Sequence, residues 1–181
     1  MNYLLTEQET RRLRFRQLTR DDFDPWIDLF RDPSACEFLG MSKLPTPRER
    51  CEKWFELSEY RIKHQLGGMN VLLDKTTDEF IGQCGLLIQE VDGIKELEIG
   101  YSILPKHWNK GYATEAAIKC RDFAFSNAYA ESLISIVHID NIKSEKVALK
   151  NGMIKMNQTI FKDAPVNIFR IDKNDWLNHD K

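Results

Sequence analysis

The sequence predicts a mixed α/β fold, in which helices pack around a central sheet with both antiparallel and parallel strand pairs. Segments that alternate polar and apolar residues are interleaved with segments of helical periodicity. The dipeptide Asp92-Gly93 joins two alternating segments, which is typical of an antiparallel hairpin. Residues 132–140, SLISIVHID, form a nearly continuous aliphatic run, as expected for a strand covered on both faces.

The N-terminal third is expected to contain one strand and two helices. Residues 12–18 alternate and predict the first strand. Residues 19–32 have an acidic start and apolar side chains at helical spacing, including Phe23, Trp26 and Phe30, which predicts a helix. Thr46 and Pro47 are typical of an N-cap and a first helical residue, so a second helix is expected over residues 46–65.

Strands over residues 69–74, 79–91 and 95–104 are expected next. A helix then starts at Gly111, because small and apolar side chains recur on one helical face. After the aliphatic strand we expect a short helix over residues 141–153, stopped at Asn151-Gly152, and a last strand over residues 166–177. Without an internal repeat or linker, residues 1–181 are predicted to form a single domain.

Composition narrows the function classes. Hydrophobic residues make up 42% of the 181 residues, and the net charge of −2 provides no global attraction to nucleic acid or to an anionic membrane. No secretory signal and no apolar run near the ~20 residues of a membrane span are visible, so a cytoplasmic protein is expected. The four cysteines are far apart and the four histidines form no HxxxH pair, which predicts reduced thiols and no metal site.

The segment HWNKGYATEAAIKC, residues 107–120, passes through a glycine directly into a helix. The first N–H groups of a helix have no acceptor within it, and the helix dipole adds partial positive charge. Such a turn can bind a diphosphate, with Lys110 as a cation and with Gly111 and Ala113 small enough for close approach. An ordinary joint whose amides bind water is the alternative. The sequence lacks the GxxxxGK[ST], GxGxxG, GxSxG and HExxH motifs of other enzyme classes.

The stretch EIGYSILPKHWNKGYATEAA, residues 98–117, resembles the acetyl-CoA-binding core of the GNAT N-acetyltransferase superfamily, and within it the RimJ/RimL-like branch. The superfamily signature is Gln or Arg, two residues, Gly, one residue, then Gly or Ala. Gly111 and Ala113 match it, and Trp108 occupies the first position, where an aromatic residue is usual in that branch. A glycine is frequent where this chain has Asn109. Residues 12–32, 80–86, 141–153 and 169–177 are similar to further elements of the branch in the same order.

This resemblance implies a GNAT fold with acetyl-CoA as cosubstrate, in which a central, mostly antiparallel mixed sheet is splayed between strands 4 and 5 and flanked by helices. The pantetheine arm would lie in that gap. Pro105 cannot donate a ladder hydrogen bond, which is consistent with strand pairing that ends there. The residues implied in cofactor binding are Ser102, Ile103, Leu104, Trp108, Asn109, Lys110, Gly111, Tyr112, Ala113, Thr114 and Asn141. For Asn141, a turn-forming role is the alternative.

Two residues are candidates for the chemistry. Alternation puts Glu96 and Glu98 on one strand face, and many GNAT enzymes place their general base where Glu98 falls. A solvated strand face is the alternative. The tyrosine that many GNAT enzymes use beside the leaving thiolate is absent, because Ala148 occupies its position. Ser144 is the nearest hydroxyl, and it is either that acid or the N-cap of the following helix.

The resemblance implies an acetyl-CoA-dependent N-acetyltransferase that moves acetyl to a primary amine in a ternary complex. A protein N-terminal α-amine, as in ribosomal-protein acetyltransferases of the branch, is the first expectation. A small-molecule amine such as a polyamine, an amino acid or an aminoglycoside is the second, and a non-catalytic acyl-CoA sensor is the third. Fold likeness does not decide among these, and it leaves open whether the protein forms a homodimer. No membrane partner and no direct nucleic-acid binding are expected.

Overall fold

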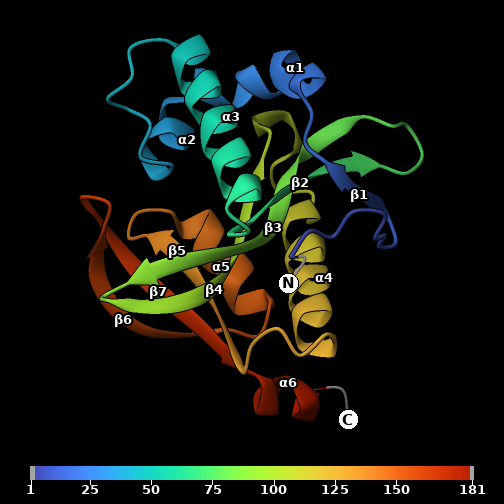
Figure 1. Cartoon of the computed structure of the whole chain (residues 1–181), viewed down its shortest axis with the longest axis vertical. Coiled ribbons are helices and arrows are strands. Elements are labelled where there is room, and N and C mark those ends of the chain that lie inside the picture. Colours follow the sequence, from blue (N-terminus) through green and yellow to red (C-terminus); the bar gives the residue numbers. More distant parts are fainter. Residues whose placement is uncertain (1–2, 180–181) are drawn as a thin grey trace.

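A seven-stranded mixed sheet forms the centre of the computed structural model, which describes residues 3–179 (Figure 1). The strand order across the sheet is β1-β2-β3-β4-β5-β7-β6. In chain order the strands are β1 (Leu13–Gln17), β2 (Gly67–Asp74), β3 (Phe80–Val91), β4 (Ile94–Ile103), β5 (Ser132–His138), β6 (Ile154–Phe161) and β7 (Ala164–Asp172).

The junction of β4 and β5 is the irregular place in this sheet. These two strands are parallel and share a single registered pair, Glu98 with Ile134, whereas the other neighbours pair antiparallel over five or more residues. Beyond Glu98 the two strands separate. The prediction of a mixed, mostly antiparallel sheet that opens between strands 4 and 5 is therefore confirmed.

Helices cover both faces of the sheet. In chain order they are α1 (Phe23–Ile27), α2 (Pro33–Phe38), α3 (Pro47–Lys63), α4 (Tyr112–Ser126), α5 (Ile142–Lys150) and α6 (Lys173–His179), with 3-10 turns at Arg20–Asp22, Asp28–Arg31 and Pro105–His107. Helices α1, α2 and α3 gather at one end of Figure 1, and α6 lies at the other.

Two apolar clusters attach the helices to opposite faces of the sheet. Ala116, Ala117 and Cys120 of α4 pack on inward side chains of the central strands, including Leu97 and Ile99 of β4. On the other face, side chains of the α1–α3 layer pack against Val71, Leu73 and Phe80; the largest of them are Trp26, Phe30 and Phe55. Because successive residues of β4 point to opposite faces, Glu98 faces the α3 side and Ile99 the α4 side.

Several local predictions hold. Helix α3 starts with the capping box that Thr46 and Glu49 form, with Pro47 as its first residue. The β3–β4 hairpin turns at Asp92-Gly93, whose φ angles are 50° and 79°. Helix α4 begins directly after Gly111. These are places where local chemistry determines the structure without help from distant residues.

Three local predictions are wrong. The helix expected over residues 19–32 is broken into two 3-10 turns and the short α1. No strand was expected over residues 154–161, yet β6 forms there as an edge strand with mostly exposed side chains. The last strand was expected to reach residue 177, but β7 ends at Asp172 and α6 begins at Lys173.

Three further observations concern the thiols, the helices and groups that could bind a metal ion. All four cysteines are free and buried, and the Sγ atoms of Cys84 and Cys120 lie 3.5 Å apart between the sheet and α4. Among residues 3–179, no helix combines the length and the apolar composition that a membrane crossing requires. Within the same range, no group of three or more His, Cys, Asp or Glu side chains is arranged to hold a metal ion.

Candidate active site

One cavity of about 810 Å³ passes through the sheet where β4 and β5 separate. Its wall includes Glu98 from the α3 face of β4, and Tyr101 from the α4 face of the same strand. Residues of α2, α3 and the β6–β7 turn line it on one side, and residues of α5 and of the start of α4 line it on the other. The cavity thus connects the two faces of the molecule through the gap.

Most of the predicted site residues line this cavity together. They are Glu98, Ser102, Ile103, Trp108, Asn109, Gly111, Tyr112, Ala113, Thr114, Asn141 and Ser144. Leu104 is absent from the wall: its side chain is buried with the α1–α3 cluster, its N–H donates to Ile81 O, and its carbonyl accepts from His107 N. Lys110 is absent as well. These two residues do not line the cavity, and their predicted roles in cofactor binding stay predictions.

The edge of β4 that faces the gap is formed by alternate residues. Ile99 O accepts a hydrogen bond of 2.9 Å from Ser135 Oγ of β5, and Ile103 O accepts one of 2.7 Å from Trp108 Nε1. Ser102 O points the other way, since a Cβ on Gly82 of β3 would lie 2.4 Å from it. Because neighbouring residues of a strand direct their main-chain groups to opposite sides, Tyr101 presents its N–H and C=O to the gap.

The start of α4 leaves its first amides unpaired within the helix. Gly111 is the N-cap with φ 82°, and Asn109 has φ 61°, so the chain turns sharply before the helix. The first helical hydrogen bond runs from Glu115 N to Gly111 O. The N–H groups of the three residues before Glu115 have no acceptor in their helix, and they lie at the positive end of its dipole.

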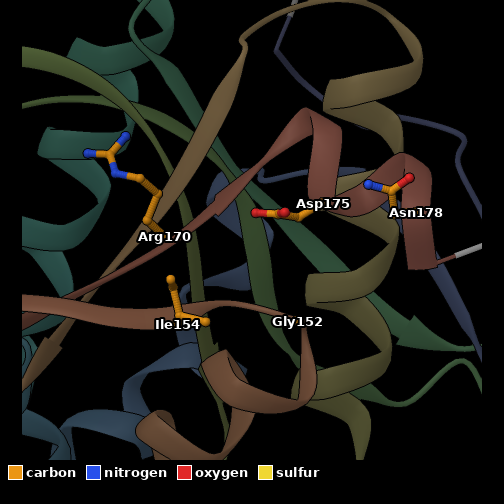
Figure 2. Close-up of a pocket in the computed structure, with 5 residues that line it drawn as sticks. All are labelled: Gly152, Ile154, Arg170, Asp175 and Asn178. Atoms are coloured by element: carbon orange, nitrogen blue, oxygen red, sulfur yellow. The ribbon is translucent and has the colours of Figure 1, made fainter.

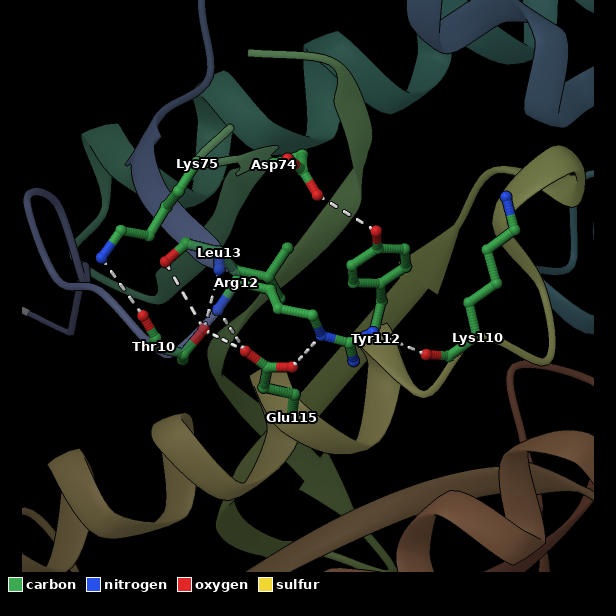
Figure 3. A network of polar contacts seen from close by, with 8 residues as sticks. All are labelled: Thr10, Arg12, Leu13, Asp74, Lys75, Lys110, Tyr112 and Glu115. Carbon is green, nitrogen blue, oxygen red and sulfur yellow. Dashed lines mark hydrogen bonds and ion pairs between the residues drawn. The ribbon is translucent and has the colours of Figure 1, made fainter. Parts of the chain in front are cut away.

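A polar network fixes this turn to the N-terminal strand (Figure 3). The Arg12 side chain donates from Nε to Glu115 Oε2 at 2.7 Å and from Nη1 to Lys110 O at 2.9 Å, and its guanidinium lies 4.3 Å from the Tyr112 ring centre. The Tyr112 hydroxyl donates to Asp74 Oδ2 at 3.1 Å. The conformation of residues 110–115 therefore depends on contacts with residues far away in the sequence.

Positive charge reaches the cavity from α5 rather than from Lys110. Lys143, Lys146 and Lys150 all line the wall, and their spacing places them on one side of the helix. The Lys143 ammonium lies 3.9 Å from the Trp108 ring centre, close enough for a cation–π contact. In Figure 3 the Lys110 side chain extends away from Arg12 and Glu115. The lysine periodicity of α5 was visible in the sequence, so these residues could have been found there.

Glu98 is held by neutral and basic neighbours on the α3 side of the gap. Gln89 Nε2 donates to Glu98 Oε2 at 2.7 Å, and Arg61 Nη2 donates to Gln89 Oε1 at 2.8 Å. Because a guanidinium can only donate, Arg61 fixes which end of the Gln89 amide faces Glu98. Burial raises the pKa of the Glu98 carboxyl, while Gln89, Arg61 and Lys162 act in the opposite direction. A raised pKa is what a general base working near neutral pH requires.

Glu96 does not share this environment. Its carboxylate pairs with Arg170 of β7, which also donates to Ser132 Oγ. Glu96 and Glu98 thus have different side-chain partners, and neither carboxylate stands free on a solvated strand face.

The start of α5 holds the second chemical candidate. Asn141 is the N-cap, since its Oδ1 accepts from Ser144 N at 3.1 Å, so the alternative of Ser144 as the N-cap is wrong. The Tyr101 hydroxyl donates to Ser144 O at 2.8 Å, and burial raises the pKa of that phenol. Ala148 is fully buried in the core. Among the hydroxyl residues that line the cavity, Tyr101, Ser102, Ser135 and Ser144 come from β4, β5 and the start of α5.

A second, smaller pocket of about 360 Å³ lies elsewhere, between the end of α5 and α6 (Figure 2). It is lined by Gly152, Ile154, Arg170, Asp175 and Asn178, none of which lines the larger cavity. The Arg170 guanidinium is already paired with Glu96 and points away from Asp175 in Figure 2. Nothing in this pocket adds to the site at the gap.

Comparison with known families decides what kind of site this is. Residues 12–154 match the model of the acetyltransferase (GNAT) domain. The chain belongs to the GNAT acetyltransferase family. A relative, the uncharacterized protein YkkB of Bacillus subtilis strain 168, is 30% identical over 166 residues, which is 91% of this chain and 94% of YkkB.

Solved GNAT structures share the fold at low sequence identity. Spermidine N-acetyltransferase of Vibrio cholerae, solved with CoA and spermine, matches with a TM-score of 0.72 at 19% identity, over 93% of this chain and 100% of that one. RimL, the ribosomal L7/L12 α-N-protein acetyltransferase, solved with coenzyme A, matches with a TM-score of 0.73 at 14% identity, over 92% and 97%. Proteins with different acceptors are thus equally similar in fold, so fold alone does not identify the acceptor of this GNAT protein.

The residues that sequence reasoning missed are those that other elements bring to the gap. Gln89 and Arg61 approach Glu98 from β3 and α3, and Ser135 crosses from β5. Arg12 of the N-terminal segment likewise contacts the turn before α4. No local pattern marks these residues, because their roles arise from tertiary packing in this GNAT fold.

Proposed function

We propose that this protein transfers the acetyl group of acetyl-CoA to a primary amine in a ternary complex, with an N-terminal α-amine as the acceptor. The observation that carries the proposal is the single cavity through the sheet. It has anion-binding features on one face and a buried carboxylate on the other. Two substrates that approach from opposite faces would meet at the gap between β4 and β5.

The cofactor side of the cavity fits the chemical parts of coenzyme A. The free amides of Tyr112, Ala113 and Thr114 suit a diphosphate, and the lysines of α5 supply positive charge beside them. The main-chain groups of Tyr101 at the open edge of β4 suit the amides of a pantetheine arm. This assignment replaces Leu104 by Tyr101 in the predicted set, and it keeps Asn109 and Gly111 as the residues that shape the turn.

Glu98 is the proposed general base. The ammonium form of the acceptor gives a proton to Glu98, directly or through a water molecule, and the freed amine attacks the thioester carbonyl. A nitrogen–carbon bond forms and the carbon–sulfur bond breaks. The nitrogen loses its second proton as the amide forms, and the leaving thiolate takes up that proton. The pKa of an α-amine is ~8 and that of a lysine side chain is ~10.4, so an α-amine is deprotonated more easily by a weak base.

Ser144 is the proposed hydrogen-bond donor to the leaving thiolate. Its side chain lines the cavity at the start of α5, and its main-chain carbonyl is held by the Tyr101 hydroxyl. Asn141 supports this residue as the helix cap, since it accepts from the Ser144 N–H. In this proposal Asn141 positions Ser144 at the cofactor.

The assignment to a RimJ/RimL-like branch is part of the same proposal. Trp108 supports it: the indole stands at the aromatic position of that branch, donates to Ile103 O at the gap and contacts Lys143. A cytoplasmic location is consistent with reduced, buried thiols.

An acceptor screen tests the proposal. Thiol release from acetyl-CoA would be measured with N-terminal peptides, free amino acids, spermidine and an aminoglycoside, and CoA binding would be measured separately by calorimetry. Acetyl-dependent release with at least one α-amine is expected. Tight CoA binding with no release from any amine would overturn the transferase proposal in favour of an acyl-CoA sensor, for which the buried Ala148 is the motivating feature.

A further inference from the structure

The acceptor half of the cavity carries an excess of positive charge. We use this name for the wall formed by α2, α3, the α3 face of β2, β3 and β4, and the β6–β7 turn. Its charged groups are Glu98, Arg61 and Lys162. Asp140 is the other carboxylate residue that lines the cavity. It follows the end of β5, its side chain is exposed, and its Oδ2 atom lies 3.8 Å from His138 Nδ1.

Arg61 is firmly held but not neutralised. Its guanidinium donates to the main-chain oxygens of Leu66 and Ile88 and to Gln89 Oε1, which are all uncharged acceptors. Burial lowers the pKa of Arg61, and Glu98 is the charge that opposes this effect. Glu98 is therefore the carboxylate that offsets the positive charge of Arg61. The Gln89 amide lies between the two groups and hydrogen-bonds to both.

Lys162 adds a second cation to the same place. Its partial exclusion from water and the charge of Arg61 lower the pKa of the Lys162 ammonium, and Glu98 again acts in the opposite direction. Two cations and one carboxylate therefore line this half of the cavity, and that carboxylate is the proposed base. When Glu98 accepts a proton during catalysis, the two positive charges remain without a partner.

The backbone at Lys162 is unusual for a lysine. Lys162 and Asp163 form the two-residue turn of the β6–β7 hairpin, with φ angles of 49° and 67°. Asn and Gly are the residues that favour such a turn, and a lysine there costs about 1–3 kcal/mol. Beside it, Asp163 Oδ2 lies 3.4 Å from Lys43 Nζ of the segment between α2 and α3, and both side chains are exposed. Strain of this kind is typical of functional positions.

Much of the rest of the acceptor half is apolar. Trp54 and Leu57 of α3, Met69 of β2 and Leu87 of β3 line it, and the Trp54 indole is fixed by a hydrogen bond to Gln83 Oε1. At Gly100 a Cβ would lie 2.7 Å from Leu87 Cδ1, so the glycine lets the Leu87 and Met69 side chains pack closely against β4. These side chains line the cavity and present an apolar surface next to the charged cluster.

We infer that the acceptor is an amine with a carboxylate a few bonds away and an apolar group, and that Lys162, supported by Arg61, binds that carboxylate. This inference rests on the proposed acetyl transfer. The carboxylate can belong to a free amino acid or to an acidic residue that follows a peptide N-terminus. Polyamines and aminoglycosides are polycations, and the same two charges repel them.

The test compares acceptors of different charge. One set is peptides of a single sequence with Glu, Gln or Lys at the second position, and another is leucine, leucinamide and spermidine. We expect kcat/KM to be about five- to tenfold higher for the Glu peptide than for the Gln peptide, and lowest for the Lys peptide. Leucine has a free α-carboxylate and leucinamide has none. A higher kcat/KM for leucine than for leucinamide would therefore identify a free amino acid as the source of the carboxylate.

Variants of Lys162 identify the residue responsible. Lys162→Gln should remove the preference for Glu, and Lys162→Glu should reverse it toward the Lys peptide and spermidine. Lys155→Gln is the matched control, because Lys155 is an exposed residue of the neighbouring strand and does not line the cavity. Equal kcat/KM for the Glu, Gln and Lys peptides would overturn the inference and leave acetyl transfer intact. An equal loss of kcat/KM for all three peptides in Lys162→Gln would do the same. Intact CoA binding without any turnover would instead overturn the proposed function.

Discussion

Gly111→Glu offers a direct test of the diphosphate site. Gly111 has φ 82°, and a Cβ at this position would lie 3.4 Å from Arg12 Nη2. The substitution therefore has two separable effects: backbone strain in a left-handed conformation, and a carboxylate beside the free amides of α4. Gly111→Ala introduces the first effect without the second and is the matched control.

The two effects have different magnitudes and different readouts. The strain costs about 1–2 kcal/mol whether or not CoA is bound, so it lowers the melting temperature by about 4 °C and leaves the Kd nearly unchanged. A carboxylate about 6 Å from one phosphate charge costs about 3 kcal/mol at an effective dielectric constant of about 20. Each 1.4 kcal/mol is about tenfold in Kd, and screening reduces the full value, so we expect weakening of at least about tenfold.

Calorimetric titration of CoA at two salt concentrations measures this difference. Gly111→Glu should bind CoA much more weakly than Gly111→Ala, and the gap should narrow at high salt because the repulsion is screened. Equal affinities of the two variants would refute the placement of the diphosphate at this turn.

The remaining predictions concern Glu98. Glu98→Gln should lower kcat by about 10²–10⁴-fold at pH 7 with little change in the Kd of CoA, and the deficit should shrink near pH 9 as an α-amine loses its proton unaided. An unchanged kcat would remove Glu98 from the mechanism. Gln89→Leu removes a donor that favours the ionised carboxylate, so the pKa of Glu98 should rise. Because a base is inactive once protonated, the acid limb of kcat/KM should move to higher pH; a limb that stays in place would contradict this role.

Local signals were enough for much of this fold. The capping box at Thr46 and the Asp92-Gly93 turn fix their own conformations through neighbouring atoms. The glycine turn before α4 and the strand parity that sets Glu98 apart from its neighbours are also local properties. These features could therefore be predicted before any tertiary contact was known.

Other features depend on distant parts of the chain. Strand β6 lies at the sheet edge with Ile154, Met156 and Ile160 exposed. Its alternation covers only residues 154–157 and stops at Gln158-Thr159, so the strand signal in the sequence is weak. Leu104 follows the predicted edge in sequence, but its N–H pairs with Ile81. The surroundings of Glu98 come from three separate elements, and only packing brings them together.

The passage through the sheet also bears on the order of events during turnover. Since its lining residues come from both faces of the molecule, neither substrate has to cross the other's binding surface to arrive. In the proposed ternary complex, each product would leave toward the face from which its substrate arrived. The order of arrival and departure is then governed by relative affinities and concentrations, with no obstruction of one path by the other.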